Sequence, residues 1–143
     1  MKALTVRQPW ASLIAAGIKP VENRTWPVPR GFTGPLMIHA AAAVDKTAMD
    51  EQHVRDALGE DMLLPDLPTS AILAVVGKVE PHRDLIGGHC APWGLDDCWH
   101  WVLSDVRALT VPVPAKGRLG LWTPDEAVLL AAAWEHTKTT AVA

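Results

Sequence analysis

The chain has 143 residues, of which 49% are hydrophobic and 20% are charged, and its net charge is −3 at pH 7. This composition is typical of one globular domain and excludes a disordered chain. The small negative charge also argues against a protein that binds nucleic acid over its whole surface. We expect a single domain over residues 1–143, with a core at about 2–123 and a C-terminal helix and tail at 124–143.

In the first half of the chain, residues 2–6 predict a short strand. A helix is expected from Gln8-Pro9-Trp10 to Gly17, because proline is tolerated in a first helical turn and glycine commonly ends a helix. Residues 20–26 are expected to be extended, and alternation predicts a strand at 35–40. A broken apolar stripe with acids on the other face predicts one helix over 44–59.

In the second half, the β-branched run at 71–80 predicts the clearest strand, and residues 81–98 are expected to be irregular. Residues 99–109 predict another strand, and residues 112–114 and 116–122 indicate a turn into a last strand. A helix is expected at 124–134, followed by a frayed tail. Five or six strands without a β-α-β rhythm favour an α+β fold, namely a small mixed β-barrel with flanking helices.

Charge is distributed unevenly along the chain. Residues 1–40 carry five Lys or Arg and one Glu, which gives +4. Residues 45–66 carry two basic and seven acidic residues, which gives −5, and residues 107–118 carry three basic residues and no acid. If the first and third segments meet in space, the protein has a basic face despite its acidic total.

The densest group of chemistry-bearing residues lies at 17–26, where Lys19, Glu22, Arg24 and Trp26 fall within eight residues. In an extended segment Glu22, Arg24 and Trp26 point to one side. An ammonium, a carboxylate, a guanidinium and an indole together can hold a flat anionic ligand such as a nucleotide. The alternative is a structural ion pair of Glu22 with Lys19 or Arg24 on the sheet surface.

These segments resemble the ASCH domain family, a branch of the PUA-like superfamily. The resemblance rests on RQPWASLIAAGIKPVENRTW, PLMIHA, WHWVLSDVRAL and PVPAKGRLGLW, in that order from Thr5 to Trp122. Its most specific element is G-x-K-x-x-E-x-R, here Gly17, Lys19, Glu22 and Arg24. The resemblance implies a PUA-like β-barrel with a cleft lined by this motif.

The same resemblance implies RNA, or a nucleoside derived from it, as the ligand. The expected ligand-binding residues belong to the motif and to three further segments: Gln8, Trp10, Lys19, Glu22, Arg24, Trp26, His39, Lys116 and Arg118. Members of the family include coactivator-associated domains, RNA binders, enzymes that degrade RNA, and an amidohydrolase that deacylates acetylated cytidine.

The amidohydrolase uses a Lys, a Thr three residues later and a distant Glu. Lys19 matches the first, whereas Glu22 stands at the position of the Thr. Glu80 and Asp97 match the third only by rough position. If the chain is an enzyme, Lys19 and Glu22 are the expected catalytic pair, with water as the nucleophile.

His89, Cys90, Cys98 and His100 carry the nitrogen and sulfur atoms that zinc prefers. Their spacing lacks the paired C-x-x-C elements of common zinc sites, so we expect no metal and no cofactor.

Three function classes remain open. The first is an RNA- or nucleotide-binding module, and the second is a hydrolase acting on RNA or on an acylated nucleoside. The third is a protein-interaction module that uses the acidic segment 44–59, or a zinc-containing module. No apolar run approaches the ~20 residues of a membrane span, and no secretory signal is recognisable. With only two cysteines, a cytoplasmic protein with no membrane partner is expected, and its oligomeric state is left open.

Overall fold

The computed structural model describes residues 1–84 and 90–141. Its elements in chain order are β1 (Lys2–Gln8), α1 (Trp10–Ala15), β2 (Val21–Arg24), β3 (Leu36–Val44), η1 (Lys46–Asp50), α2 (Gln52–Leu58), η2 (Leu64–Asp66), β4 (Ala71–Asp84), β5 (Cys98–Pro114), β6 (Leu121–Trp122) and α3 (Glu126–Ala141). No helix in this described part is both long and apolar enough to cross a membrane.

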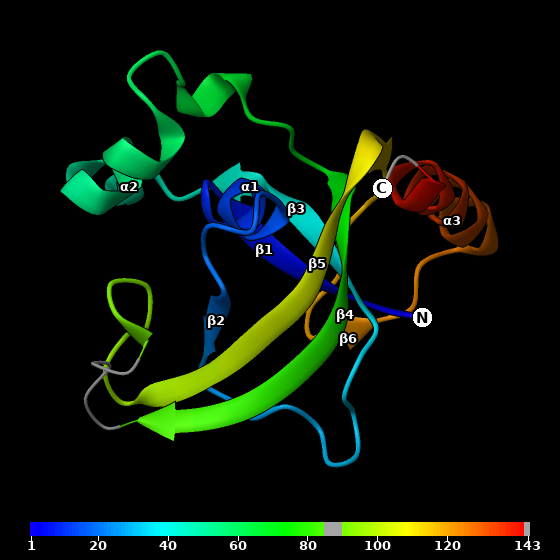
Figure 1. The fold of residues 1–143 in the computed structure, drawn as a ribbon, viewed down its shortest axis with the longest axis horizontal. Helices are drawn as coiled ribbons and strands as arrows, with labels where there is room; N and C mark the ends of the chain where they lie inside the picture. Colours follow the sequence, from blue (N-terminus) through cyan, green and yellow to red (C-terminus); the bar gives the residue numbers. More distant parts are fainter. Residues whose placement is uncertain (85–89, 142–143) are drawn as a thin grey trace.

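The strands form one mixed sheet in the order β2-β5-β4-β3-β1-β6. β1 and β3 run parallel, and the other neighbouring strands run antiparallel. In Figure 1 the long strands β4 and β5 curve together across the molecule, with α3 on one side and α1 and α2 toward the other. The fold is therefore α+β, as expected.

The predicted barrel is not confirmed, because the sheet does not close on itself. β2 and β6 are its two edges, and no ladder joins them in the described chain. Instead, Arg24 on β2 donates from Nη2 to the backbone oxygen of Thr5 on β1 at 2.7 Å. We call this side-chain junction between β1 and β2 the seam.

The core divides between the two faces of the sheet. Leu73, Ala74 and Val76 of β4 belong to a cluster that also contains the fully buried Trp101. Ile72 and Val75 belong to a second cluster that α3 covers. Strict alternation is broken because the register shifts between Ile72 and Ala74 at a bulge.

Several predicted boundaries were wrong. The helix expected over 44–59 is two short pieces, η1 and α2, separated at Glu51, whose backbone is extended. β3 runs on to Val44, which pairs with Gln8. β4 extends into the segment expected to be irregular, β5 continues through Pro114, and α3 continues through the expected tail to Ala141.

Candidate ligand-binding site

The motif residues lie where α1 ends and β2 begins. Gly17 has a positive φ of 75°, which lets the chain reverse after α1. The backbone N–H of Lys19 then donates to the oxygen of Leu13 at 3.1 Å. This turn brings the Lys19 side chain close to Trp10 of α1, and Lys19 is only 3% exposed.

Lys19, Glu22 and Arg24 form one ionic cluster. Lys19 Nζ lies 3.2 Å from Glu22 Oε1 and 2.6 Å from the backbone oxygen of Val21. Arg24 donates to Glu22 Oε2 from Nε at 3.1 Å and from Nη2 at 2.8 Å. Glu22 is 6% exposed, and Asn23 N donates a further bond to Oε1. The carboxylate therefore neutralises two cations at once and holds Arg24 across the seam.

The first cavity, which we call the tryptophan hollow, has a volume of about 490 Å³ and opens beside this cluster. Lys19 Nζ lies 5.6 Å from the centre of the Trp10 ring, within reach of a cation–π contact. The lining is aromatic and polar and consists of Thr5, Val6, Arg7, Trp10, Lys19, Glu22, Asn23, Arg24, Thr25, Trp26, Asp45, Glu51, His53, Pro92, Trp93 and Leu95.

Trp10 and Trp26, two of the three tryptophans that line this hollow, are held in place by neighbouring residues. Trp10 Nε1 donates to Asp45 Oδ2 at 3.1 Å. The pKa of Asp45 is lowered, chiefly because Thr47 donates a hydrogen bond to its carboxylate and also because Trp10 does. Trp26 packs edge-on against the buried Trp101 at 4.8 Å between ring centres.

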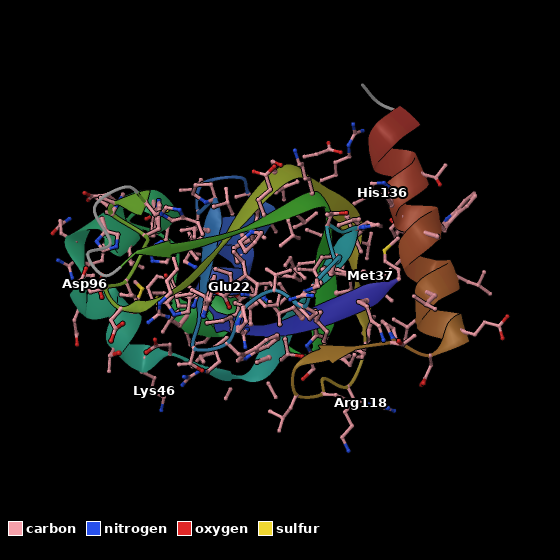
Figure 2. The ribbon with its side chains drawn as sticks, turned by 90° about the horizontal axis from the view of Figure 1, so that it is seen from below. Glu22, Met37, Lys46, Asp96, Arg118 and His136 are labelled. Atoms are coloured by element: carbon pink, nitrogen blue, oxygen red, sulfur yellow. The ribbon has the colours of Figure 1, made fainter. Side chains whose placement is uncertain are left out.

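The second cavity, the basic hollow, has a volume of about 470 Å³. Its lining includes Lys116, Gly117 and Arg118 of the β5–β6 loop, together with Thr5, Arg7, Arg24, His39, Ala41, Ala42, Ser70, Leu119 and Gly120. Figure 2 shows Arg118 projecting from this loop while Glu22 lies inside the domain. The first and third basic segments therefore meet, which satisfies the condition that the charge pattern set for a basic face.

The two hollows share Thr5, Arg7 and Arg24 in their linings. They are thus adjoining parts of one groove along the seam, with tryptophans in one part and cations in the other. Arg7, Lys116 and Arg118 are exposed, whereas Arg24 is 22% exposed and held by Glu22.

His39 forms the floor of the basic hollow and is 1% exposed. Its Nε2 lies 2.6 Å from the oxygen of Ala115, so Nε2 carries the proton and donates it. Its Nδ1 is buried without a hydrogen-bond partner in the described chain. A Cβ added at Gly117 would lie 2.9 Å from this Nδ1, so glycine lets the loop approach the ring.

Burial lowers the pKa of His39 below 6.5, and the bond to Ala115 only partly opposes this. The unfolded chain therefore binds a proton more readily than the folded chain between the two pKa values. We expect stability to fall as the pH drops from 6.5 toward the folded pKa, by at most about 1.4 kcal/mol per pH unit, the limit for one proton.

Chemical unfolding between pH 7.5 and 5 measures this, with His39→Gln as the control because an amide can still donate to Ala115 but does not titrate. An unchanged pH slope in His39→Gln would exclude His39 as the source.

Not every expected ligand-binding residue lies in the groove. Trp10, Lys19, Glu22, Arg24 and Trp26 line the tryptophan hollow, and His39, Lys116 and Arg118 line the basic hollow. Gln8 lines neither. It is 0% exposed, and its amide bonds with Ser12 and with the oxygen of Pro68, so its position is that of a structural residue at the start of α1.

Arg7, Asn23 and Trp93 also line the groove, although they were not among the expected ligand-binding residues. Asn23 donates to the oxygen of Trp93 at 2.9 Å and accepts from Leu95 N at 3.0 Å. These bonds attach the segment before β5 to β2 and place Trp93 in the hollow. Arg7 could have been found from the sequence, because it belongs to the same RQPW element as Trp10. The contact between Asn23 and Trp93 could not, because 70 residues separate them and no local pattern records it.

The other candidate carboxylates lie elsewhere. Glu80 pairs with Lys78, and Asp97 pairs with Arg83, both on exposed surface outside the two hollows. Of the four residues considered for a metal, His89 lies outside the described residues. Cys98 Sγ contacts Asn23 Oδ1 at 3.6 Å and the oxygen of Leu95 at 3.4 Å. Instead, His82, Cys90 and His100 come together.

Comparison with known proteins adds two findings. The family model of the ASCH domain matches residues 4–83. A human protein, activating signal cointegrator 1, is 28% identical over 138 residues, which is 87% of this chain. The chain spans about a fifth of that relative, since the match covers 22% of its length.

Proposed function

The chain belongs to the ASCH domain family, and from that premise we propose that it binds single-stranded RNA in the groove along the seam. The family generally binds RNA. The observation that carries the proposal is the sharing of Thr5, Arg7 and Arg24 by an aromatic hollow and a basic hollow. A nucleotide has the same two parts, a flat base and an anionic phosphate.

The tryptophan hollow suits a base. Trp10 and Trp26 offer indole surface, and each is fixed by a neighbour, Trp10 by Asp45 and Trp26 by Trp101. Stacking of a base on an aromatic side chain contributes ~1–3 kcal/mol and depends little on the identity of the base. The polar groups around the rings include the Thr25 hydroxyl, which can donate to and accept from a base edge.

The basic hollow suits the backbone. Arg7, Lys116 and Arg118 are exposed cations around one cavity. Phosphate contacts of this kind supply affinity and position the strand without reading its sequence. Gly117 lets the backbone of the loop come close to a bound phosphate, because no side chain stands between them.

The geometry favours binding over hydrolysis. Lys19 Nζ donates to Val21 and Glu22, and all four hydrogen bonds to the Glu22 carboxylate come from groups of the chain itself. A general base needs a lone pair directed at the proton it removes, and a general acid needs a proton to give. Lys19 and Glu22 are therefore better suited to positioning Arg24 than to proton transfer.

The test is the affinity for a fluorescent single-stranded RNA at several salt concentrations. With three exposed cations on phosphates, we expect log K to fall against log salt with a slope of about −2. Lys116→Ala and Arg118→Ala should each reduce that slope by about 0.7 and weaken binding at low salt. Lys46→Ala, which removes an exposed cation outside both hollows, is the matched control.

Binding that does not respond to salt, or that weakens equally in Lys46→Ala, contradicts the proposal. The RNA is recovered after each assay and its length is measured. An acylated cytidine is incubated in parallel and its products are separated. Turnover of either substrate that is lost in Lys19→Gln would establish the hydrolase instead.

A further inference from the structure

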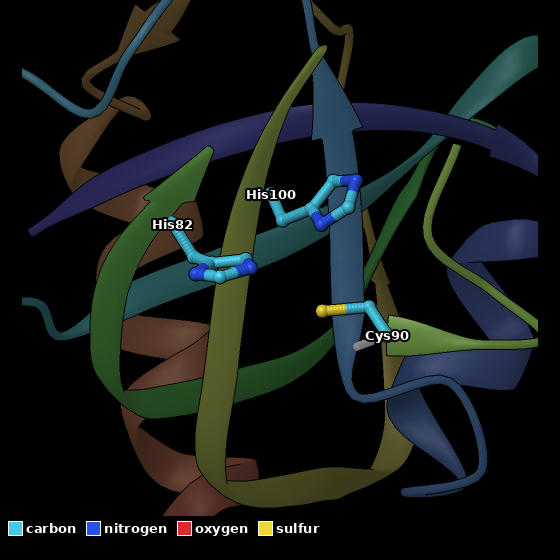
Figure 3. Close-up of side chains that lie close together, drawn as sticks. All are labelled: His82, Cys90 and His100. Atoms are coloured by element: carbon cyan, nitrogen blue, oxygen red, sulfur yellow. The ribbon is translucent and has the colours of Figure 1, made fainter. Parts of the chain in front are cut away.

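Three side chains of types that commonly bind metals lie close together where β4 ends and β5 begins. They are His82 on β4, His100 on β5 and Cys90 in the segment before β5, and their ligand atoms all lie within 4.8 Å of one another. His82 and His100 are directly opposite in the ladder, so they share one face of the sheet. Figure 3 shows the Cys90 sulfur pointing between the two imidazole rings.

His100 is oriented as a metal-binding histidine usually is. It is 0% exposed, and its Nε2 lies 2.7 Å from the oxygen of Leu95, to which it donates its proton. Its Nδ1 therefore carries a lone pair, and this atom is buried without a hydrogen-bond partner in the described residues. A backbone carbonyl that accepts from one ring nitrogen fixes the tautomer that leaves the other nitrogen available to a metal.

The backbone around Cys90 is built for this close approach. The N–H groups of Trp93 and Gly94 both donate to the oxygen of Cys90, at 2.9 and 2.7 Å, and close a tight turn. A Cβ at Gly94 would lie 2.5 Å from the Cβ of Cys90 and 2.8 Å from Cε1 of His100. Only glycine at 94 leaves space for Cys90 and His100 to come together.

We propose that His82, Cys90 and His100 bind one zinc ion, with water or another small ligand in the fourth position. One thiolate and two imidazoles are a donor set that suits tetrahedral Zn²⁺. Ligand atoms on such an ion, with bonds of ~2.0–2.3 Å, lie roughly 3.3–3.8 Å apart. The three ligand atoms lie within 4.8 Å of one another, so side-chain movements of about 1 Å bring them into this range. This proposal departs from the expectation of no metal, and it does not include Cys98 among the ligands.

The ion would connect the sheet to one wall of the tryptophan hollow. Cys90 begins the turn that carries Trp93 and Leu95, and both of these line the hollow. Metal binding at Cys90 would therefore add a further anchor to a segment that Asn23 and His100 already hold by hydrogen bonds. The site itself does not depend on RNA binding, and it is tested without RNA.

The whole chain is freed of metal with a chelator and titrated with Co²⁺ and then with Zn²⁺. We expect one equivalent of Co²⁺ to bind with the strong visible bands of tetrahedral cobalt and a thiolate-to-cobalt charge-transfer band, and Zn²⁺ to displace it. Cys90→Ser should abolish the charge-transfer band, whereas Cys98→Ser, the matched control, should retain it. His82→Gln should weaken Zn²⁺ binding by at least about 100-fold, since even supporting residues cost 10–100-fold.

Zinc should also raise the melting temperature of the wild-type chain and of Cys98→Ser, because it binds the folded state. Absence of stoichiometric metal binding by the wild-type chain overturns the proposal. So does a charge-transfer band that persists in Cys90→Ser and disappears in Cys98→Ser. If Cys90→Ser does not fold, the proposal is still tested by the metal stoichiometry of the wild-type chain and by the Zn²⁺ affinity of His82→Gln.

Discussion

Replacing Glu22 with glutamine is expected to destabilise the folded chain by about 3 kcal/mol. The amide cannot neutralise Lys19, whose side chain is 3% exposed, and it loses the charge that holds Arg24. Breaking a buried ion pair by removing one partner costs ~3–5 kcal/mol, because the remaining charge is buried without compensation. The lower end of this range applies because Arg24 is 22% exposed and water can solvate part of its charge.

Denaturant unfolding of the wild type and Glu22→Gln measures this loss. The control is Glu80→Gln, which breaks the pair of Glu80 with Lys78 on the surface, where both side chains are more than half exposed. Exposed pairs contribute little, so we expect no measurable change. Equal effects of the two substitutions would show that the motif cluster is an ordinary surface ion pair.

Trp101→Ala is expected to cost about 3–5 kcal/mol, the usual range for removing a large aromatic side chain from a core. Trp101 is 0% exposed, and its Nε1 donates to the backbone oxygen of Trp26 at 3.3 Å. The same substitution removes the surface against which the Trp26 ring packs. RNA affinity should therefore fall with stability, because Trp26 loses its fixed position in the hollow.

Thermal and denaturant unfolding of Trp101→Ala, compared with Trp134→Ala, test this prediction. Trp134 lies on α3 and is 62% exposed, so its replacement should change the stability only slightly. A Trp101→Ala variant as stable as Trp134→Ala would mean that the stability of the core cluster around Trp101 does not depend on this ring.

Local patterns predicted that Glu22 and Arg24 lie on the same side of their strand, for a physical reason. Side chains alternate along an extended strand, so Glu22 and Arg24 had to share a face, and the structure joins them through two hydrogen bonds. The turn at Gly17 was recognisable as the end of a helix, and it places Lys19 beside them. What spacing did not reveal was that the carboxylate would be saturated by its neighbours, which changes the role expected of Lys19.

The errors came from contacts between distant segments. Val44 is in a strand because Gln8 pairs with it, and nothing in the local helix-like pattern of 44–59 records that pairing. At the seam, β1 and β2 are joined by the Arg24 side chain and not by a strand ladder. The number of predicted strands does not show whether a sheet closes in this way. The metal-site hypothesis chose residues close in sequence and missed His82, because the partner of His100 is set by the β4–β5 register.

The central claim, that RNA lies in the groove along the seam, is tested most directly by the indole N–H signals in the NMR spectrum of the chain during titration with RNA. The chain has seven tryptophans and therefore seven such signals. We expect the signals of Trp10, Trp26 and Trp93 to shift progressively and that of Trp134 on α3 to stay in place. Shifts confined to Trp134, with the three groove signals unmoved, would contradict it.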